Sequence, residues 1–167
     1  IELAKEVNAE VVFATDPDAD RLGIAVRHKE EYVFLTGNQI GALLLNYILM
    51  TRKELGILPK NGYVFTTNVS SSLAVLIAKK YEMNVGITLT GFKFIGDEAK
   101  KIEDKGEFVF GYEESYGYLI SDVVRDKDAI QSLIMLAEVI AYYRERGLTL
   151  VDALDKIFKE YGYYLED

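Results

Sequence analysis

The order of apolar and polar positions predicts strands and helices that alternate along most of the chain. An unbroken apolar run at 11–14 is typical of a buried strand, and apolar residues at helical spacing mark 40–48 as a helix. Further strands are predicted at 63–67, 85–89 and 108–111, with helices at about 73–77, 91–103, 128–146 and from 149 onward. Strands that alternate with helices indicate a layered α/β domain.

The first 36 residues contain too few elements to form a domain alone. Residues 1–8 have the pattern of the end of a helix, and strand candidates at 23–27 and 32–35 flank a short turn, which predicts a hairpin. We expect residues 1–36 to be the last part of one α/β domain. Residues 37–167 then form a second domain, in which helices cover both faces of a mixed sheet.

Apolar spacing also predicts which side of a helix is buried. Gly147 is expected to end the long helix at 128–146. Thr149 and Asp152 have the spacing of a capping box at the start of the last helix. The faces predicted to be buried are Leu73, Leu76 and Ile77 in one helix, and Ile130, Leu133, Ile134, Ala137, Ile140 and Ala141 in the long helix.

Composition limits the classes of protein to which the chain can belong. Half of its 167 residues are apolar and only two are proline, which indicates a globular fold. A net charge of −8 argues against a nucleic-acid partner, because nucleic-acid-binding surfaces are normally basic. The longest apolar stretch, 40–50, is too short to span a bilayer, so we expect no membrane partner. The absence of cysteine excludes a disulfide framework and fits a cytoplasmic protein. The single histidine, His28, is expected in an exposed turn.

Three alternate carboxylates follow the first strand, in Asp16-Pro17-Asp18-Ala19-Asp20-Arg21. In an extended segment, residues i, i+2 and i+4 point the same way, so the three carboxylates can converge. A hard cation such as Mg²⁺ would offset their mutual repulsion. An EF-hand is excluded, because Arg21 and Arg27 occupy its glycine and glutamate positions. The alternative is a solvated acidic turn whose aspartates bond only to local backbone.

A second candidate segment is Gly111-Tyr112-Glu113-Glu114-Ser115. If this loop is extended, Glu113 and Ser115 share a face and offer a carboxylate beside a hydroxyl. That pair suits sugar hydroxyls, which both donate and accept hydrogen bonds. The alternative is an ordinary acidic turn with its aromatic residues packed on the core.

Two further segments could contact an anion. Gly91 and Lys93 lie where a strand gives way to a helix, and the start of a helix attracts negative charge. The alternative for Lys93 is a surface position over apolar neighbours. The charged run at 124–128 precedes the long helix, where Asp126 or Asp128 can cap it. Its basic residues could also help to bind an anionic substrate.

Together, these four segments resemble the α-D-phosphohexomutase family, the phosphoglucomutases and phosphomannomutases. The resemblance implies a Mg²⁺ site and a sugar-binding loop. It also implies a lysine that acts as a general acid or base, and an arginine that orients the metal loop or meets a phosphoserine. The residues at these positions are Asp16, Asp18 and Asp20 for the metal, Glu113, Ser115, Gly91 and Lys93 for the substrate, and Lys93 and Arg21 for catalysis.

The activity implied by the resemblance is the interconversion of hexose 1-phosphate and hexose 6-phosphate through a phosphoserine and a bisphosphate intermediate. Neither the phosphoserine loop of the family's first domain nor the phosphate loop of its fourth domain occurs in this sequence. We therefore expect a fragment, covering the end of domain two and domain three, whose partners are the sugar phosphates and the remaining domains of the parent chain. Such a fragment should not turn over substrate alone.

Several alternatives remain open at the level of sequence. The Glu-Glu-Ser-Tyr-Gly form is closest to phosphoglucomutases, but a phosphomannomutase or phosphopentomutase preference is also compatible. A non-catalytic sugar-phosphate or metal-binding module would share the same residues. An aspartyl-phosphate phosphatase is disfavoured, because Leu22 stands where such an enzyme would have threonine or serine.

Overall fold

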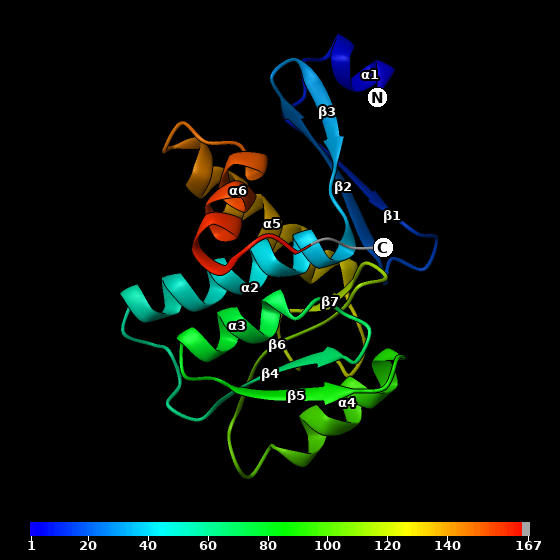
Figure 1. Cartoon of the computed structure of the whole chain (residues 1–167). Helices are drawn as coiled ribbons and strands as arrows, with labels where there is room; N and C mark the ends of the chain where they lie inside the picture. The colour runs from blue at the N-terminus through cyan, green and yellow to red at the C-terminus, as the bar shows by residue number, and fades with distance from the viewer. Residues whose placement is uncertain (165–167) are drawn as a thin grey trace.

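The first part of the chain is an antiparallel sheet that follows a short helix, α1 (Glu2–Glu6). The computed structural model describes residues 1–164 (Figure 1). Strands β1 (Val11–Thr15), β2 (Leu22–His28) and β3 (Glu31–Phe34) lie in the order β1-β2-β3. The predicted hairpin at 23–35 is therefore confirmed, as the β2–β3 pair.

The second sheet has the order β5-β4-β6-β7 and is mixed, as predicted. Strand β4 (Gly62–Thr67) runs parallel to β5 (Asn84–Thr88) and to β6 (Glu107–Glu113). Strand β7 (Gly117–Leu119), which the sequence pattern did not reveal, is antiparallel to β6. The sheet thus ends in a tight hairpin at the carboxyl end of β6.

Helices cover both faces of this second sheet. Neighbouring residues of a strand point to opposite faces, so Val64 packs in the core shared with α2 (Gly37–Glu54) and α3 (Leu73–Lys80). Phe65 packs in the other core, under α4 (Phe92–Lys101). The helix-sheet-helix layering expected from the sequence is confirmed.

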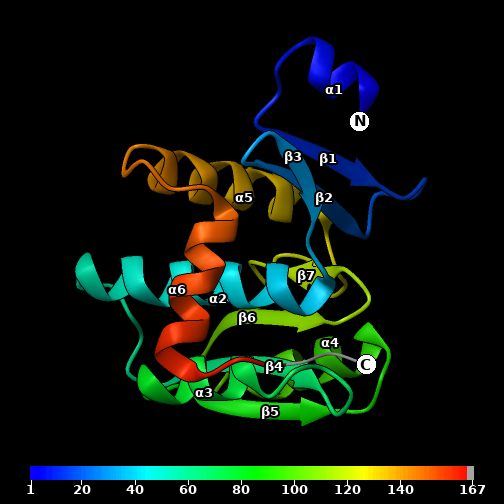
Figure 2. The same ribbon diagram turned by 45° about the horizontal axis from the view of Figure 1, so that its top comes forward.

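Two C-terminal helices join the two sheets. Helix α5 (Ala129–Arg144) lies between the first sheet and α2 (Figure 2), and α6 (Leu150–Tyr161) also contacts both α2 and β2. The predicted capping box of α6 is confirmed: Thr149 Oγ1 accepts a hydrogen bond from Asp152 N–H, and an Asp152 oxygen accepts one from Thr149 N–H. Within residues 1–164, no helix combines the length and the apolar character that crossing a bilayer would require.

The predicted buried face of α5 is wrong, and that of α3 is wrong at one residue. Ile130 and Ile134 of α5 are 55% and 64% exposed. Helix α5 is apolar on most sides, so its periodicity does not identify the inner face, which is set by contact with β2, β7 and α2. In α3, Leu73 and Ile77 are buried as expected, but Leu76 is exposed. The residues of α5 that are buried are Ala129, Ser132, Leu136, Val139 and Tyr143.

The expectation for His28 is also wrong. This residue belongs to β2, its side chain is only 18% exposed, and its Nδ1 lies 3.0 Å from Thr149 Oγ1. The polar flanks Arg27 and Lys29 concealed this burial, because the start of α6 covers His28 only in the folded chain. The contact ties the first sheet to the capping box of α6.

Candidate functional site

The acidic loop after β1 is a compact turn and not the extended segment expected from the sequence. Asp16 Oδ1 accepts hydrogen bonds from the N–H groups of Asp20 and Arg21, both at 3.1 Å, and Ala19 adopts a positive φ of 56°. The Arg21 N–H is the main cause of a lowered pKa for Asp16, so its carboxylate form is favoured. The local backbone bonding of the acidic-turn alternative is therefore present at Asp16.

The turn nevertheless brings the three carboxylates together. Asp16, Asp18 and Asp20 each offer an oxygen, and these oxygens lie within 4.8 Å of one another. Opposite ligands of Mg²⁺ are roughly 4 Å apart, because each Mg–O bond is about 2.0–2.1 Å. Asp20 Oδ1 is buried and has no hydrogen-bond partner among residues 1–164. Three hard oxygen donors, one of them without a hydrogen bond among residues 1–164, are a donor set that fits Mg²⁺.

The acidic loop lies directly against the hairpin between β6 and β7. Leu22 N–H donates a hydrogen bond to Tyr116 O at 3.0 Å, and Arg21 forms a β-bridge with Gly117. Ser115 lies at the tip of this hairpin, between the paired residues Glu113 and Gly117. One pocket of about 430 Å³ is lined by both segments, with contributions from Ala14, Asp16, Arg21, Gly23, Ser115 and Tyr116. The structure thus unites candidate residues of two distant segments.

Glu113 is held in a different way from Ser115. Its side chain is buried, with 6% of the residue exposed, and its Oε1 accepts a hydrogen bond from Gly91 N–H at 2.6 Å. Gly91 has a φ of 113°, a conformation that glycine adopts at little cost and that presents this N–H just before α4. Glu113 therefore joins the hairpin to the start of α4, whereas Ser115 remains at the pocket.

Within the described part of the chain, Lys93 neither lines the pocket with Ser115 nor has a polar contact like that of Glu113 with Gly91. Its side chain is exposed, and its ammonium lies 4.9 Å from the centroid of the Phe94 ring. This is the surface position over an apolar neighbour that was the alternative for this residue. Lys93 stands in the first turn of α4, next to the Gly91 N–H that Glu113 binds.

Glu114 is a residue of this region that sequence reasoning missed. Its Oε2 accepts hydrogen bonds from Thr67 Oγ1 at 3.1 Å and from Ser70 Oγ at 3.0 Å. Both hydroxyls belong to the segment that leaves β4, and they lie 2.8 Å from each other. Glu114 thus anchors the hairpin to the neighbouring strand end. Hydroxyl residues at the carboxyl end of a parallel strand were a signal that could have suggested such a partner.

Lys127 belongs to the charged run at 124–128, whose basic residues were candidates for an anionic substrate, and it contacts the acidic loop, which was not predicted. Its Nζ lies 2.8 Å from Asp20 Oδ2 and 3.3 Å from Asp126 Oδ1, and its side chain is 13% exposed. Burial alone would lower the pKa of Lys127, but the hydrogen bond to Asp20 and the two carboxylates raise it, so the ammonium form is kept. The neighbouring Asp128 caps α5 by accepting the N–H groups of Ile130 and Gln131, as the capping interpretation predicted.

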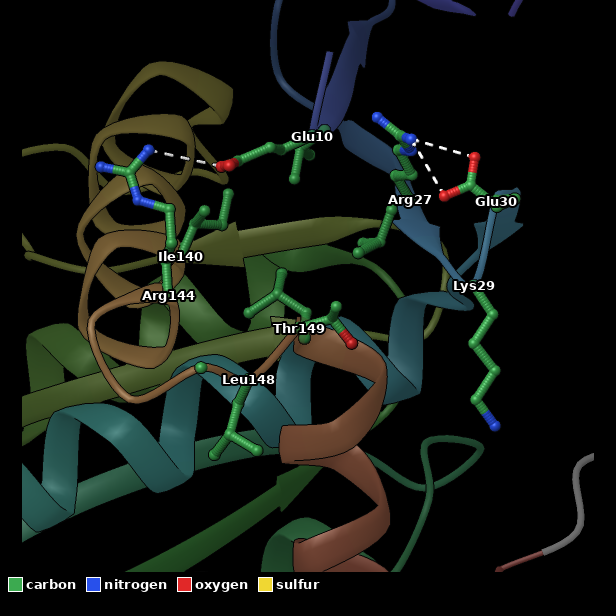
Figure 3. A pocket seen from close by; sticks show the side chains of 12 residues that line it. Glu10, Arg27, Lys29, Glu30, Ile140, Arg144, Leu148 and Thr149 are labelled. Atoms are coloured by element: carbon green, nitrogen blue, oxygen red, sulfur yellow. Dashed lines mark hydrogen bonds and ion pairs between the residues drawn. The ribbon is translucent and has the colours of Figure 1, made fainter. Parts of the chain in front are cut away.

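A separate pocket of about 320 Å³ lies between the first sheet and the α5–α6 connection (Figure 3). Four of the charged groups that line it form two ion pairs, Arg144 with Glu10 at 3.4 Å and Arg27 with Glu30 at 3.1 Å. Val11, Val26, Ile140, Leu148 and Leu150 supply its apolar lining. None of the candidate residues predicted from the sequence lines this pocket, so it is distinct from the site at the acidic loop.

Comparison with known proteins places the chain in a family. The sequence model described as "Phosphoglucomutase/phosphomannomutase, alpha/beta/alpha domain III" matches residues 36–161. A phosphoglucomutase of Staphylococcus epidermidis is 44% identical over 163 residues, which are 97% of this chain and 29% of that protein. A phosphoglucomutase of Staphylococcus aureus is 39% identical over 163 residues, with the same coverage. The chain therefore spans about 29% of the length of these curated relatives.

Solved structures share the fold at lower identity. The structure of pp63/parafusin, a phosphoglucomutase from Paramecium, has a TM-score of 0.71 at 21% identity and covers 92% of this chain and 25% of that one. An N-acetylphosphoglucosamine mutase from Aspergillus fumigatus, solved with GlcNAc-6P and magnesium, has a TM-score of 0.59 at 17% identity. It covers 78% of this chain and 30% of that one. The same enzyme has been solved in complex with glucose 1,6-bisphosphate.

Proposed function

Because the chain belongs to the phosphoglucomutase/phosphomannomutase family, we propose that it is the metal- and sugar-binding part of a Mg²⁺-dependent phosphosugar mutase. The parent enzyme interconverts hexose 1-phosphate and hexose 6-phosphate through a phosphoserine and a bisphosphate intermediate. Glucose phosphate is the proposed substrate, on the basis of relatives that are 39% to 44% identical. A cytoplasmic location belongs to the same proposal.

The observation that carries this proposal is the pocket shared by the acidic loop and the β6–β7 hairpin. Asp16 and Arg21 line one side of it and Ser115 lines the other. A metal ion at the first segment and a sugar hydroxyl at the second would be close neighbours there. An inert acidic turn gives no reason for the direct pairing of Arg21 with Gly117, or for a buried Asp20 oxygen that makes no hydrogen bond among residues 1–164.

In this proposal the chain's residues bind and orient the substrate. Asp16, Asp18 and Asp20 hold the ion, which would offset negative charge on the phosphoryl group during transfer. Arg21, whose Nε lies 3.9 Å from both Asp16 Oδ2 and Asp20 Oδ1, orients the loop and presents a cation to phosphate. Ser115 donates to and accepts from a sugar hydroxyl at the pocket.

The buried contact of Glu113 gives it two functions in the proposal. One oxygen holds the Gly91 N–H, and the carboxylate as a whole supplies negative charge beneath the sugar site. Lys93 reaches the substrate by turning away from the Phe94 ring, where it can assist proton transfer. We further propose that residues 1–36 belong to the metal-binding domain and 37–167 to the sugar-binding domain of the parent.

The whole enzyme is needed for turnover, because the phosphoserine and phosphate-binding loops lie outside this sequence. We expect the isolated chain, supplied with glucose 1-phosphate and Mg²⁺, to form no glucose 6-phosphate.

In the parent enzyme, Ser115→Ala is expected to lower kcat/KM roughly 100-fold, since a buried substrate hydroxyl would lose its partner. Steady-state kinetics of the isolated chain and of the Ser115→Ala enzyme measures the two effects.

The matched control for Ser115→Ala is Ser72→Ala. Ser72 is exposed, and its hydroxyl makes no cap hydrogen bond to α3. We expect this control to retain wild-type kcat/KM. Family-like turnover by the isolated chain, or an unchanged kcat/KM in the Ser115→Ala enzyme, would contradict the proposed division of functions.

A further inference from the structure

Lys127 contacts three of the segments that form the candidate site. Its Nζ is 2.8 Å from Asp20 Oδ2 in the acidic loop and 5.9 Å from the centroid of the Phe92 ring at the start of α4. Its stem crosses Gly117 of the hairpin, where an added Cβ would lie 2.6 Å from Lys127 Cδ. The lysine therefore runs through a channel that the absence of a side chain at Gly117 leaves open.

The backbone around Lys127 is fixed to the same segments. Asp128 N–H donates to Tyr118 O at 2.9 Å, and Ala129 N–H donates to Ala19 O at 3.1 Å. Asp128 itself caps α5. Because the two residues that follow Lys127 are bonded to the hairpin and to the acidic loop, the fold and not a freely moving surface side chain delivers the ammonium to Asp20. Only 13% of the side chain is exposed.

The fold therefore places a cation from a distant segment, Lys127, against the acidic loop. Three carboxylates within 4.8 Å repel one another, and the Lys127 ammonium offsets part of that repulsion at Asp20. A divalent ion bound by the same carboxylates would lie only a few ångströms from Nζ. The two positive charges would repel each other at that separation, so the ammonium weakens binding of the ion and the ion weakens the contact of the ammonium with Asp20.

We propose that Lys127 is a tethered counter-ion of the acidic loop, which Mg²⁺ displaces from Asp20. The proposal rests on the proposed function, because it takes the aspartates as the Mg²⁺ site. In the metal-free protein the ammonium stabilises the conformation of the acidic loop, because it offsets repulsion among the carboxylates. It also lowers the affinity of the loop for Mg²⁺. When Mg²⁺ binds, the ammonium is released between the loop and the hairpin. Lys127 is thus a positioning residue. It acts on the metal site through Asp20, and its own position depends on whether Mg²⁺ is bound.

The first test is a calorimetric titration of the 167-residue chain with MgCl₂. Lys127→Met keeps the unbranched stem over Gly117 but removes the charge, and we expect it to bind Mg²⁺ roughly tenfold more tightly than the wild type. Lys127→Arg keeps the charge and should stay near the wild-type affinity. The control Lys101→Met removes the same charge from the last turn of α4, at the opposite end from Phe92, and should leave the affinity unchanged.

The second test needs no variant. Brief acetylation of the wild-type chain with an N-hydroxysuccinimide ester, read by mass spectrometry, reports the accessibility of each lysine. We expect Lys127 to react slowly without metal and several-fold faster at saturating Mg²⁺, while the exposed Lys101 reacts equally in both.

The outcomes separate the inference from the proposed function. If the wild-type chain and Lys127→Met both fail to bind Mg²⁺, the metal site of the proposed function is wrong. If the wild type binds Mg²⁺ but Lys127→Met binds it equally or more weakly, the counter-ion proposal is overturned while the metal site stands. Mg²⁺-independent acetylation of Lys127 in a chain that binds the ion overturns the displacement step.

Discussion

The Asp18→Asn variant is expected to keep the fold and to lose Mg²⁺ affinity by roughly 100-fold or more, since even supporting residues of metal sites cost 10- to 100-fold when changed. Asp18 is the exposed member of the acidic cluster, whereas Asp16 bonds to the loop backbone and Asp20 pairs with Lys127. Replacing Asp18 therefore removes a proposed ligand but neither the backbone hydrogen bonds of Asp16 nor the ion pair of Asp20 with Lys127. Calorimetry measures the affinity, and thermal denaturation in EDTA measures the stability.

Asp104→Asn is the matched control for this substitution. Asp104 is an exposed carboxylate in the connection between α4 and β6, which leads into the amino end of β6, away from the hairpin. Both variants change the net charge by the same amount. We expect Asp104→Asn to bind Mg²⁺ like the wild type; equal losses in the two variants would mean that general electrostatics, and not ligation, governs binding.

The Gly37→Ala variant is expected to lose about 2–4 kcal/mol of the free energy of unfolding. A Cβ on Gly37 would lie 1.9 Å from the carbonyl oxygen of Glu114, so the start of α2 and the hairpin cannot keep their positions. Alanine is otherwise favoured over glycine in a helix, so propensity would predict the opposite sign. Urea denaturation of the variant gives the change in free energy.

Gly23→Ala provides the comparison for Gly37→Ala. The nearest atom to a Cβ on Gly23 would be Tyr116 Cδ1 at 4.0 Å, an ordinary contact. Because glycine in a strand is itself slightly destabilising, we expect Gly23→Ala to be neutral or to gain a few tenths of a kcal/mol. A Gly37→Ala protein as stable as Gly23→Ala would contradict the close packing of hairpin and helix.

The order of the elements could be predicted from the sequence because it depends on local patterns. The alternation of strands and helices and the capping box at Thr149 both follow from spacing within a few residues. Strand β7 escaped notice because it is only three residues long and its pairing with β6 is visible only in three dimensions. The inner face of α5 was wrong for a related reason, since a helix that is apolar on most sides takes its orientation from its neighbours.

In the candidate site too, features that depend on local spacing could be predicted and long-range contacts could not. The three aspartates could be singled out because their spacing is local, although the turn that gathers them was only the alternative to an extended segment. The contacts of Lys127 and Glu114 could not be predicted, because their partners, Asp20 and Ser70, lie far away in the sequence. Long-range pairs of this kind leave no period or short motif in a single sequence.

The central claim is that one pocket holds the metal loop on one side and the sugar-binding hairpin on the other. Its most direct test is an NMR titration of the ¹⁵N-labelled chain, first with Mg²⁺ and then with glucose 1-phosphate. We expect Mg²⁺ to shift the amide signals of 16–21, and the sugar phosphate then to shift those of 113–117. Shifts from either ligand that leave both segments unmoved, or that gather elsewhere on the chain, would contradict it.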